Sequence, residues 1–217
     1  MDRVRLFGDG DGPKQILALG AHPDDIEIGC GGTILRLVAE QRSLEVTWVV
    51  FTSTPERAAE GRSSAAAFLE GVSTKKVIIR DYRDGFLPYS GPAVKDEFEA
   101  LKRECSPDLV LTHYRDDRHQ DHRLISELTW NTWRDHLILE YEIPKYDGDF
   151  GSPNFFASLP ARTLDRKIDL LHEHFASQRG KPWFTADLFR AVARIRGMEA
   201  AAAGGHAEGF YGRKALF

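Results

Sequence analysis

Short apolar runs rich in Val, Ile and Leu alternate along the chain with longer stretches whose apolar positions recur at helical spacing. The segment 45–52, Glu-Val-Thr-Trp-Val-Val-Phe-Thr, has the clearest strand pattern. We expect strands at 15–20, 45–52, 76–80, 108–113, 137–143 and 154–159. We expect helices at 29–42, 55–69, 94–104, 122–134, 163–177 and 183–203. Strands that alternate with helices predict an α/β fold with a mostly parallel sheet and helices on both faces.

Polar clusters follow two of the predicted strands. The strand 15–20 runs through Ala21 into His22-Pro23-Asp24-Asp25, and the strand 108–113 leads into a polar loop that ends at His122. Ligands of such folds bind beyond the carboxyl ends of the strands. Because parallel strands end at the same edge of a sheet, we expect these two clusters to lie close together.

His22 and Asp25 have the spacing of two ligands on one metal ion, and Pro23 stiffens the turn between them. A third ligand from a distant segment would leave the open position of a catalytic zinc site. His122 is the natural candidate, because we expect it to open a helix at the same sheet edge. Mixed imidazole and carboxylate ligands favour zinc or another divalent transition metal over magnesium or calcium.

Three further side chains are candidates for proton transfer. Asp24, next to a ligand, could act as general base toward a water whose pKa the metal lowers. His119 could face the site as an acid that stabilises an oxyanion or protonates a leaving amine. Asp121 could orient His119 and keep it cationic.

Each of these segments also has a simpler interpretation. Asp24 or Asp25 alone could cap the following helix, and polar residues in the loop 115–122 are usually only solvated. The joint occurrence of two clusters with complementary ligand types favours a metal hydrolase. The glycines in 29–32 are interpreted as structural, since they let the helix pack close to the sheet. The stretch 141–149 is either a substrate loop or an ordinary turn.

Composition limits the class of protein. The chain has 217 residues, of which 42% are hydrophobic and 29% charged, and we expect a single domain at 1–217 with a flexible lead-in at 1–14. No apolar run approaches the roughly 20 residues of a membrane helix, and the N-terminus does not resemble a secretory signal. The net charge of −4 disfavours nucleic acid or membrane as partner. Two cysteines, Cys30 and Cys105, suit a reducing cytoplasm.

Two long motifs make the sequence recognisable. The first, Ala21-His22-Pro23-Asp24-Asp25-Ile26-Glu27-Ile28-Gly29-Cys30-Gly31-Gly32-Thr33, resembles the signature of the PIG-L/LmbE-like zinc deacetylases, which are relatives of N-acetylglucosaminylphosphatidylinositol de-N-acetylase. The second, Asp117-Arg118-His119-Gln120-Asp121-His122-Arg123, resembles the second motif of that family. The similarity runs from about residue 15 to the C-terminus, including the tail at 207–210.

The resemblance implies a Rossmann-like three-layer fold and zinc-dependent hydrolysis of an N-acetyl group on a small amino sugar or sugar conjugate. By motif position, the metal ligands would be His22, Asp25 and His122, the general base Asp24, and the second catalytic pair His119 and Asp121. It also implies a substrate-binding arginine after the second strand, for which we favour Arg57 over Arg62 because Glu60 follows it at the spacing of the family.

The alternatives are an amidase for a larger N-acyl conjugate, such as a thiol-sugar or an antibiotic intermediate, and a non-catalytic metal-binding homologue. Relatives often form homo-oligomers, so the resemblance allows self-association as well.

Overall fold

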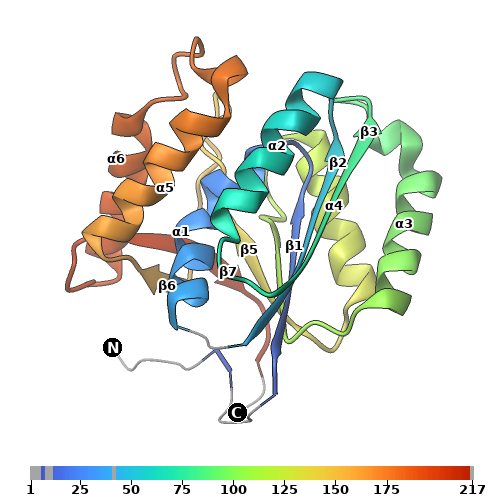
Figure 1. Ribbon diagram of the computed structural model, residues 1–217, viewed down its shortest axis with the longest axis horizontal. Coiled ribbons are helices and arrows are strands. Elements are labelled where there is room, and N and C mark those ends of the chain that lie inside the picture. The colour runs from blue at the N-terminus through green and yellow to red at the C-terminus, as the bar shows by residue number, and fades with distance from the viewer. Residues whose placement is uncertain (1–5, 8–11, 41–42, 216–217) are drawn as a thin grey trace.

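The computed structural model describes residues 6–7, 12–40 and 43–215, and within them a seven-stranded sheet has the order β3-β2-β1-β4-β5-β7-β6 (Figure 1). The strands are β1 (Lys14–Gly20), β2 (Leu44–Thr52), β3 (Thr74–Tyr82), β4 (Leu109–His113), β5 (Leu137–Tyr141), β6 (Phe155–Ser158) and β7 (Ala207–Gly212). The strands from β3 to β5 pair in parallel, whereas β7 is antiparallel to both β5 and β6.

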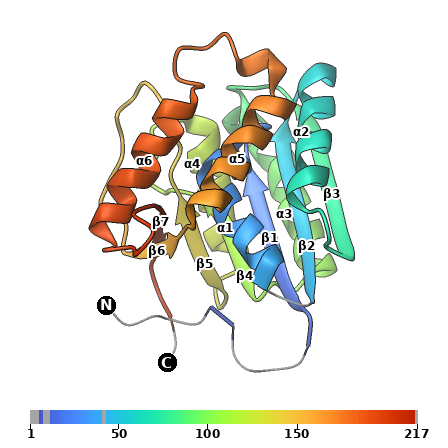
Figure 2. The same cartoon turned by 60° about the vertical axis from the view of Figure 1, so that its left-hand side comes forward.

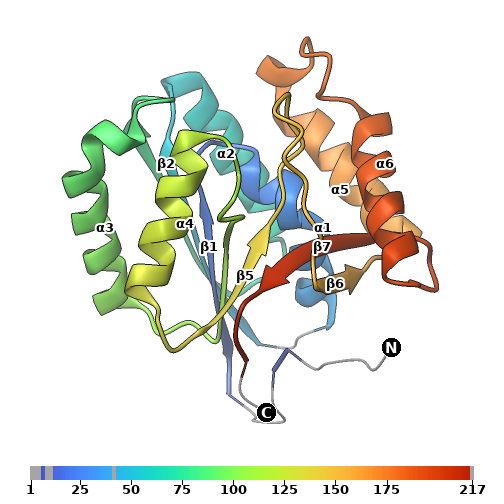
Figure 3. The ribbon, with the colours of Figure 1, turned by 180° about the vertical axis from the view of Figure 1, so that it is seen from behind.

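Helices cover both faces of this sheet. They are α1 (Asp25–Glu40), α2 (Pro55–Phe68), α3 (Gly91–Glu104), α4 (Gln120–Thr132), α5 (Ala161–His174) and α6 (Ala186–Glu199), with 3-10 turns η1 (Leu87–Ser90) and η2 (Ala176–Gln178). Figure 2 shows α1, α2, α5 and α6 on one side, and Figure 3 shows α3 and α4 in front of the opposite side. The predicted α/β fold, a three-layer sandwich with a mostly parallel sheet, is confirmed. No helix in the described ranges is long and apolar enough to cross a bilayer.

Alternation along the strands divides the core into two layers. Ile16 and Ala18 of β1 face the layer under α1, α2, α5 and α6, while Leu17 and Leu19 face the layer under α3 and α4. All four side chains are buried. Burial on both faces explains why these strands read as continuous apolar runs in the sequence.

Of the helices that begin earlier than predicted, two begin within the polar motifs. Helix α1 begins at Asp25 instead of Gly29, because the Ile28 N–H already donates to the Asp24 carbonyl at 2.8 Å. Helix α4 begins at Gln120 instead of His122, with His119 as its N-terminal cap. Apolar spacing, the signal used to place both helices, is interrupted in these first turns by Asp25 and Glu27 in α1 and by Gln120 and Asp121 in α4. The candidate residues therefore lie on or beside the first turns of helices, which hold them rigidly.

Lys14, the last residue of the predicted lead-in at 1–14, already pairs with Leu44 in the sheet. Residues 1–5 and 8–11 of that lead-in lie outside the described residues.

The interpretation of the glycines in 29–32 as close-packing positions agrees with the structure. A Cβ atom on Gly29 would overlap the buried ring of Tyr141, and one on Gly31 would lie 2.6 Å from the Phe68 ring. Helix α1 can approach the sheet and α2 this closely only because these side chains are absent.

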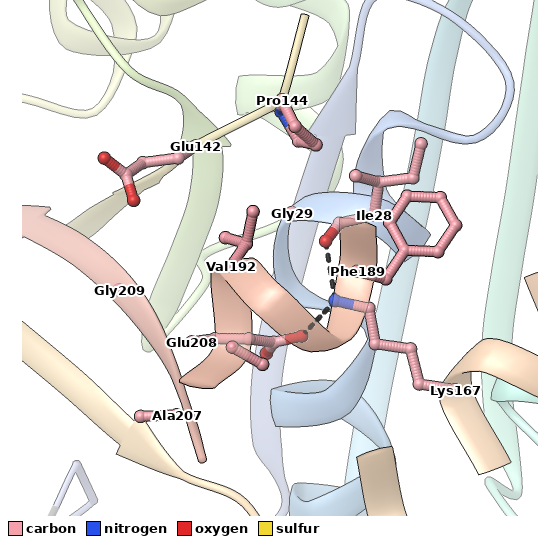
Figure 4. Close-up of a pocket in the computed structure, with 11 residues that line it drawn as sticks. Ile28, Gly29, Glu142, Pro144, Lys167, Phe189, Val192, Ala207, Glu208 and Gly209 are labelled. Carbon is pink, nitrogen blue, oxygen red and sulfur yellow. Dashed lines mark hydrogen bonds and ion pairs between the residues drawn. The ribbon is translucent and has the colours of Figure 1, made fainter. Parts of the chain in front are cut away.

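The C-terminal tail forms β7, a strand that the local pattern does not predict, and it inserts between β5 and β6. Glu208 of this strand accepts hydrogen bonds from the backbone N–H groups of Gly32 (2.8 Å) and Thr33 (2.7 Å) in α1. The Lys167 ammonium of α5 lies 2.6 Å from both Glu208 and the Ile28 carbonyl (Figure 4). These groups border a small cavity of about 30 Å³, and the buried ion pair connects α1, α5 and β7.

Candidate active site

The two polar clusters meet at one edge of the sheet, as predicted. His22 and Asp25 lie in and just after the turn that follows β1, and His122 lies in the first turn of α4, which follows β4. Strands β1 and β4 are neighbours in parallel, so their carboxyl ends bring together residues about a hundred positions apart.

Three ligand-type atoms converge here. His22 Nδ1 lies 3.2 Å from His122 Nε2, and Asp25 Oδ2 lies 3.2 Å from His22 Nδ1 and 3.5 Å from His122 Nε2. Asp25 and His122 are buried, and the His22 side chain is 14% exposed. The structure thus brings together all three residues that the sequence predicts as metal ligands.

The outer nitrogen of each imidazole faces carboxylate oxygens. His122 Nδ1 lies 2.9 Å from Asp117 Oδ2, and His22 Nε2 lies 3.1 Å from Asp84 Oδ1 and 3.3 Å from Asp121 Oδ2. Since an ionised carboxylate only accepts hydrogen bonds, the outer nitrogens are the ones that carry protons. The inner nitrogens can then offer lone pairs to a cation that lies beside Asp25.

Such a group of acceptors needs a positive charge at its centre. Burial lowers the pKa of His22, but the carboxylates of Asp25, Asp121 and Asp84 outweigh it and raise that pKa well above its usual value, so a proton can supply the charge. A divalent metal can supply it as well. Two imidazoles and a carboxylate suit zinc, and histidine ligands in proteins usually donate their outer N–H to a carboxylate, as here. The residues present therefore fit a metal ion.

Among the described residues, other groups of side chains also have ligand spacing. One is Asp25, His113 and His122, and another is His22, His119 and His122. His113 Nε2 lies 3.3 Å from Asp25 but accepts the backbone N–H of Ala21 at 2.9 Å, so its lone pair is already used. His113 stacks on His122 with ring centroids 3.9 Å apart, and we interpret it as support for that ligand.

Asp24 is held beside this group in an unusual backbone conformation. Its φ angle is 109°, a region that L-residues rarely adopt and that is typical of functional sites. Burial raises the pKa of Asp24 to about 7, although the Arg57 guanidinium 3.0 Å away opposes this. The carboxyl group therefore has a proton affinity suited to a general base near neutral pH.

Arg57 lies on the cavity wall, but protein groups already occupy its guanidinium. Besides Asp24, it donates to the Pro23 carbonyl, to Glu60 at 3.0 Å and to Ser177 at 3.3 Å. Glu60 in turn accepts the Ser177 backbone N–H at 2.8 Å. The Arg57–Glu60 ion pair thus connects α2 both to the turn after β1 and to η2.

Asp121 lies differently from the expectation that it orients His119. Its carboxylate contacts His22 and accepts the backbone N–H groups of Gly85 (2.7 Å) and Leu87 (3.1 Å). His119 Nδ1 accepts the backbone N–H of Asp121 at 3.3 Å as the helix cap. Burial and the charge of His22 lower the pKa of His119, whereas the nearby Asp121 carboxylate raises it.

Sequence reasoning assigned no role to two carboxylates of the site. Asp117 contacts His122 and also accepts the His119 backbone N–H at 2.8 Å, and Asp84 contacts His22 from the loop after β3. Asp117 stands within the second motif, so its proximity to His122 was the available signal. Asp84 has no comparable sequence context, because only the β3–η1 turn brings it to the site.

A cavity of about 550 Å³ opens above these residues. The lining residues include the five residues His22, Asp24, Asp25, His119 and His122, together with Arg57, Arg83, Lys145, Lys181 and Trp183. This volume is in the range of small-molecule sites.

Comparison with known proteins places the chain in a family. The model of the PIG-L family, described as GlcNAc-PI de-N-acetylase, matches residues 17–133. The uncharacterized deacetylase YaiS of Escherichia coli is 29% identical over 189 residues, which is 80% of this chain and 99% of that protein. The diacetylchitobiose deacetylase of Thermococcus kodakarensis is 29% identical over 126 residues, 51% of this chain and 45% of that enzyme.

Solved structures share the fold. The N,N'-diacetylchitobiose deacetylase of Pyrococcus horikoshii superposes with a TM-score of 0.72 at 24% identity, over 92% of this chain and 84% of that chain. Because the family model covers more than half of the chain and spans both motifs of the site, the protein belongs to the PIG-L family of hydrolytic N-deacetylases.

Proposed function

We propose that the protein is a zinc-dependent hydrolase that removes the N-acetyl group from an amino sugar or sugar conjugate. His22, Asp25 and His122 would hold the metal. The observation that carries this proposal is the convergence of three ligand-type atoms within 3.5 Å in the lining of a 550 Å³ cavity, next to Asp24.

A divalent metal bound there would supply Lewis acidity that polarises the amide carbonyl and acidifies the attacking water. Asp24 accepts the proton of that water as it attacks the carbonyl carbon. The C–N bond of the tetrahedral intermediate then breaks, and the proton goes to the leaving amine. The products are acetate and a free amino sugar.

His119 and Asp24 are the two candidates for donating that proton. The rings of His119 and His22 lie edge to face, with centroids 4.8 Å apart, and His119 lines the cavity. Because His119 Nδ1 accepts a backbone N–H, a neutral His119 ring carries its proton on Nε2. That N–H can point into the cavity and stabilise the developing oxyanion. Asp24 would then return the proton that it took from water.

Arg57 and Asp121 support these groups. Arg57 holds the Asp24 carboxylate at 3.0 Å and borders the cavity, where it can also contact substrate. Asp121 fixes His22 from the side opposite Asp25. We further propose that the enzyme acts in the cytoplasm, where its cysteines Cys30 and Cys105, both free in the structure, would stay reduced.

Acetate release from a panel of N-acetylated sugars, measured with zinc-loaded protein, tests the proposal. We expect release from at least one N-acetylhexosamine derivative. A fully metal-loaded protein that released nothing from simple sugars but cleaved larger N-acyl conjugates would favour the alternative amidase. A loaded protein silent on both sets would contradict the hydrolase and favour a non-catalytic homologue.

A further inference from the structure

Asp117 connects both histidines of the second motif. Its side chain is 2% exposed, Oδ2 lies 2.9 Å from His122 Nδ1, and Oδ1 accepts the His119 backbone N–H at 2.8 Å. A buried carboxylate in this position fixes the proton of His122 on Nδ1, so that Nε2 keeps its lone pair free for a metal ion beside Asp25.

Lys145 holds Asp117 from the loop after β5. Its ammonium lies 2.8 Å from Asp117 Oδ2, 2.7 Å from the Asp149 carboxylate and 3.2 Å from the Ile143 carbonyl. An ammonium has three N–H donors, and each has an acceptor here. Lys145 borders the cavity, yet its charge and its donors are taken up by the protein.

Asp149 contacts the same loop of the second motif. Its carboxylate accepts the backbone N–H of Arg118 at 2.7 Å and is 6% exposed. The segment 117–119 is therefore held at two points, the Asp117 side chain and the Arg118 backbone, by two residues four positions apart on one loop.

We propose that Lys145, acting through Asp117, is a positioning residue that holds His122 in the orientation and tautomer that binds metal. This inference rests on the proposed metal site. Without the ammonium, the buried Asp117 carboxylate loses its charge partner and is free to turn away from His122 or to take up water. The stretch 141–149, for which the sequence leaves open a substrate loop or an ordinary turn, then serves to support the metal site.

The test is the dissociation constant for Zn²⁺, measured by competition with a chromophoric chelator. Asp117→Asn keeps the shape of the side chain but can present its amide N–H to His122, which favours the wrong tautomer. We expect it to weaken zinc binding by about 10- to 100-fold. Lys145→Met should weaken binding by a smaller factor, and Lys145→Arg, which keeps the charge, should recover part of the loss.

Lys181→Met is the matched control, because Lys181 lines the same cavity and, among the described residues, contacts Trp183 rather than a carboxylate. Its zinc affinity should equal that of the wild type. Thermal unfolding of the metal-free variants identifies any that fail to fold. If Lys145→Met fails to fold, the zinc affinity of Lys145→Arg is compared with that of the wild type in its place.

Two results would overturn the inference in different ways. Wild-type zinc affinity in folded Asp117→Asn and Lys145→Met would contradict the positioning role while leaving the metal site intact. A wild-type protein that binds no zinc would contradict the proposed metal site itself, and the inference with it.

Discussion

His22 Nδ1 and His122 Nε2 lie 3.2 Å apart although 100 residues separate them in the chain. The outer nitrogens of both rings face carboxylates, so the inner pair has room for one cation, which is either a second proton on His22 or a metal ion. This approach of two acceptors beside the Asp25 carboxylate is the physical reason for expecting a bound cation.

Metal binding should stabilise the fold. A ligand that binds only the folded state at 100 times its dissociation constant adds about 2.7 kcal/mol to the free energy of unfolding. For a chain of this size that corresponds to a rise of roughly 5–10 °C in the unfolding midpoint. Differential scanning calorimetry with and without Zn²⁺ measures it, and His122→Ala should show no zinc-dependent rise. An equal rise in that variant would place the metal elsewhere.

Asp24→Asn should abolish most turnover while keeping the metal. Loss of a general base lowers kcat by about 10²- to 10⁴-fold, whereas the three proposed ligands stay in place. Acetate release and zinc content, measured on the same sample, separate the two effects. Asp96→Asn, an exposed change on α3, is the control and should leave both unchanged. If the Asp24→Asn enzyme kept a near wild-type rate, Asp24 would not be the general base.

Arg57→Met should affect kcat more than KM. The Arg57 guanidinium is already engaged by Asp24, Glu60 and Ser177, so its removal disturbs the base before it disturbs substrate binding. Steady-state kinetics on any cleaved substrate give the two constants. Arg62→Met, on the exposed side of the same helix, should change neither. A rise in KM alone would instead make Arg57 a residue that binds substrate.

Gly29→Ala should destabilise the protein strongly. The added methyl group would overlap the buried Tyr141 ring, whose hydroxyl donates to the Leu19 carbonyl at 2.6 Å, and overpacking of this kind costs about 1–3 kcal/mol or more. Urea unfolding measures the difference. Gly91→Ala is the control, because that glycine has an ordinary helical conformation with open space around it. If both variants unfolded alike, the close-packing interpretation would be wrong.

Lys167→Met should cost about 3–5 kcal/mol of stability, because it leaves the buried Glu208 carboxylate without its charge partner. The same change at Lys76, whose pair with Glu104 is more than half exposed, should cost at most about 1 kcal/mol. Chemical denaturation of both variants makes the comparison. Equal losses would mean that the Lys167 pair contributes no more than a surface contact.

The sequence predicts the site well where one rule of the fold applies. Parallel strands end at a common edge, so the order of strands and polar clusters along the chain is enough to place His22 after β1 beside His122 after β4. The same rule does not predict that Asp84 and Lys145 contact the site, because the paths of the loops after β3 and β5 depend on packing between distant segments.

Strand β7 shows the same limit in the fold. The segment 207–212 is short, contains two glycines and has little strand pattern of its own. It becomes a strand because β5 and β6 provide hydrogen-bonding edges, and because Glu208 meets Lys167 and the helix α1 backbone. These partners are distant in sequence, so local periodicity carries no signal of them.

The central claim is that one metal ion at His22, Asp25 and His122 is required for deacetylation. Titration of metal-free protein with Zn²⁺ while acetate release from a cleaved N-acetyl sugar is recorded tests it most directly. We predict activity that is absent without metal, rises linearly and levels off at one zinc ion per chain. Activity that is equal in the chelated and the zinc-loaded protein would contradict the claim.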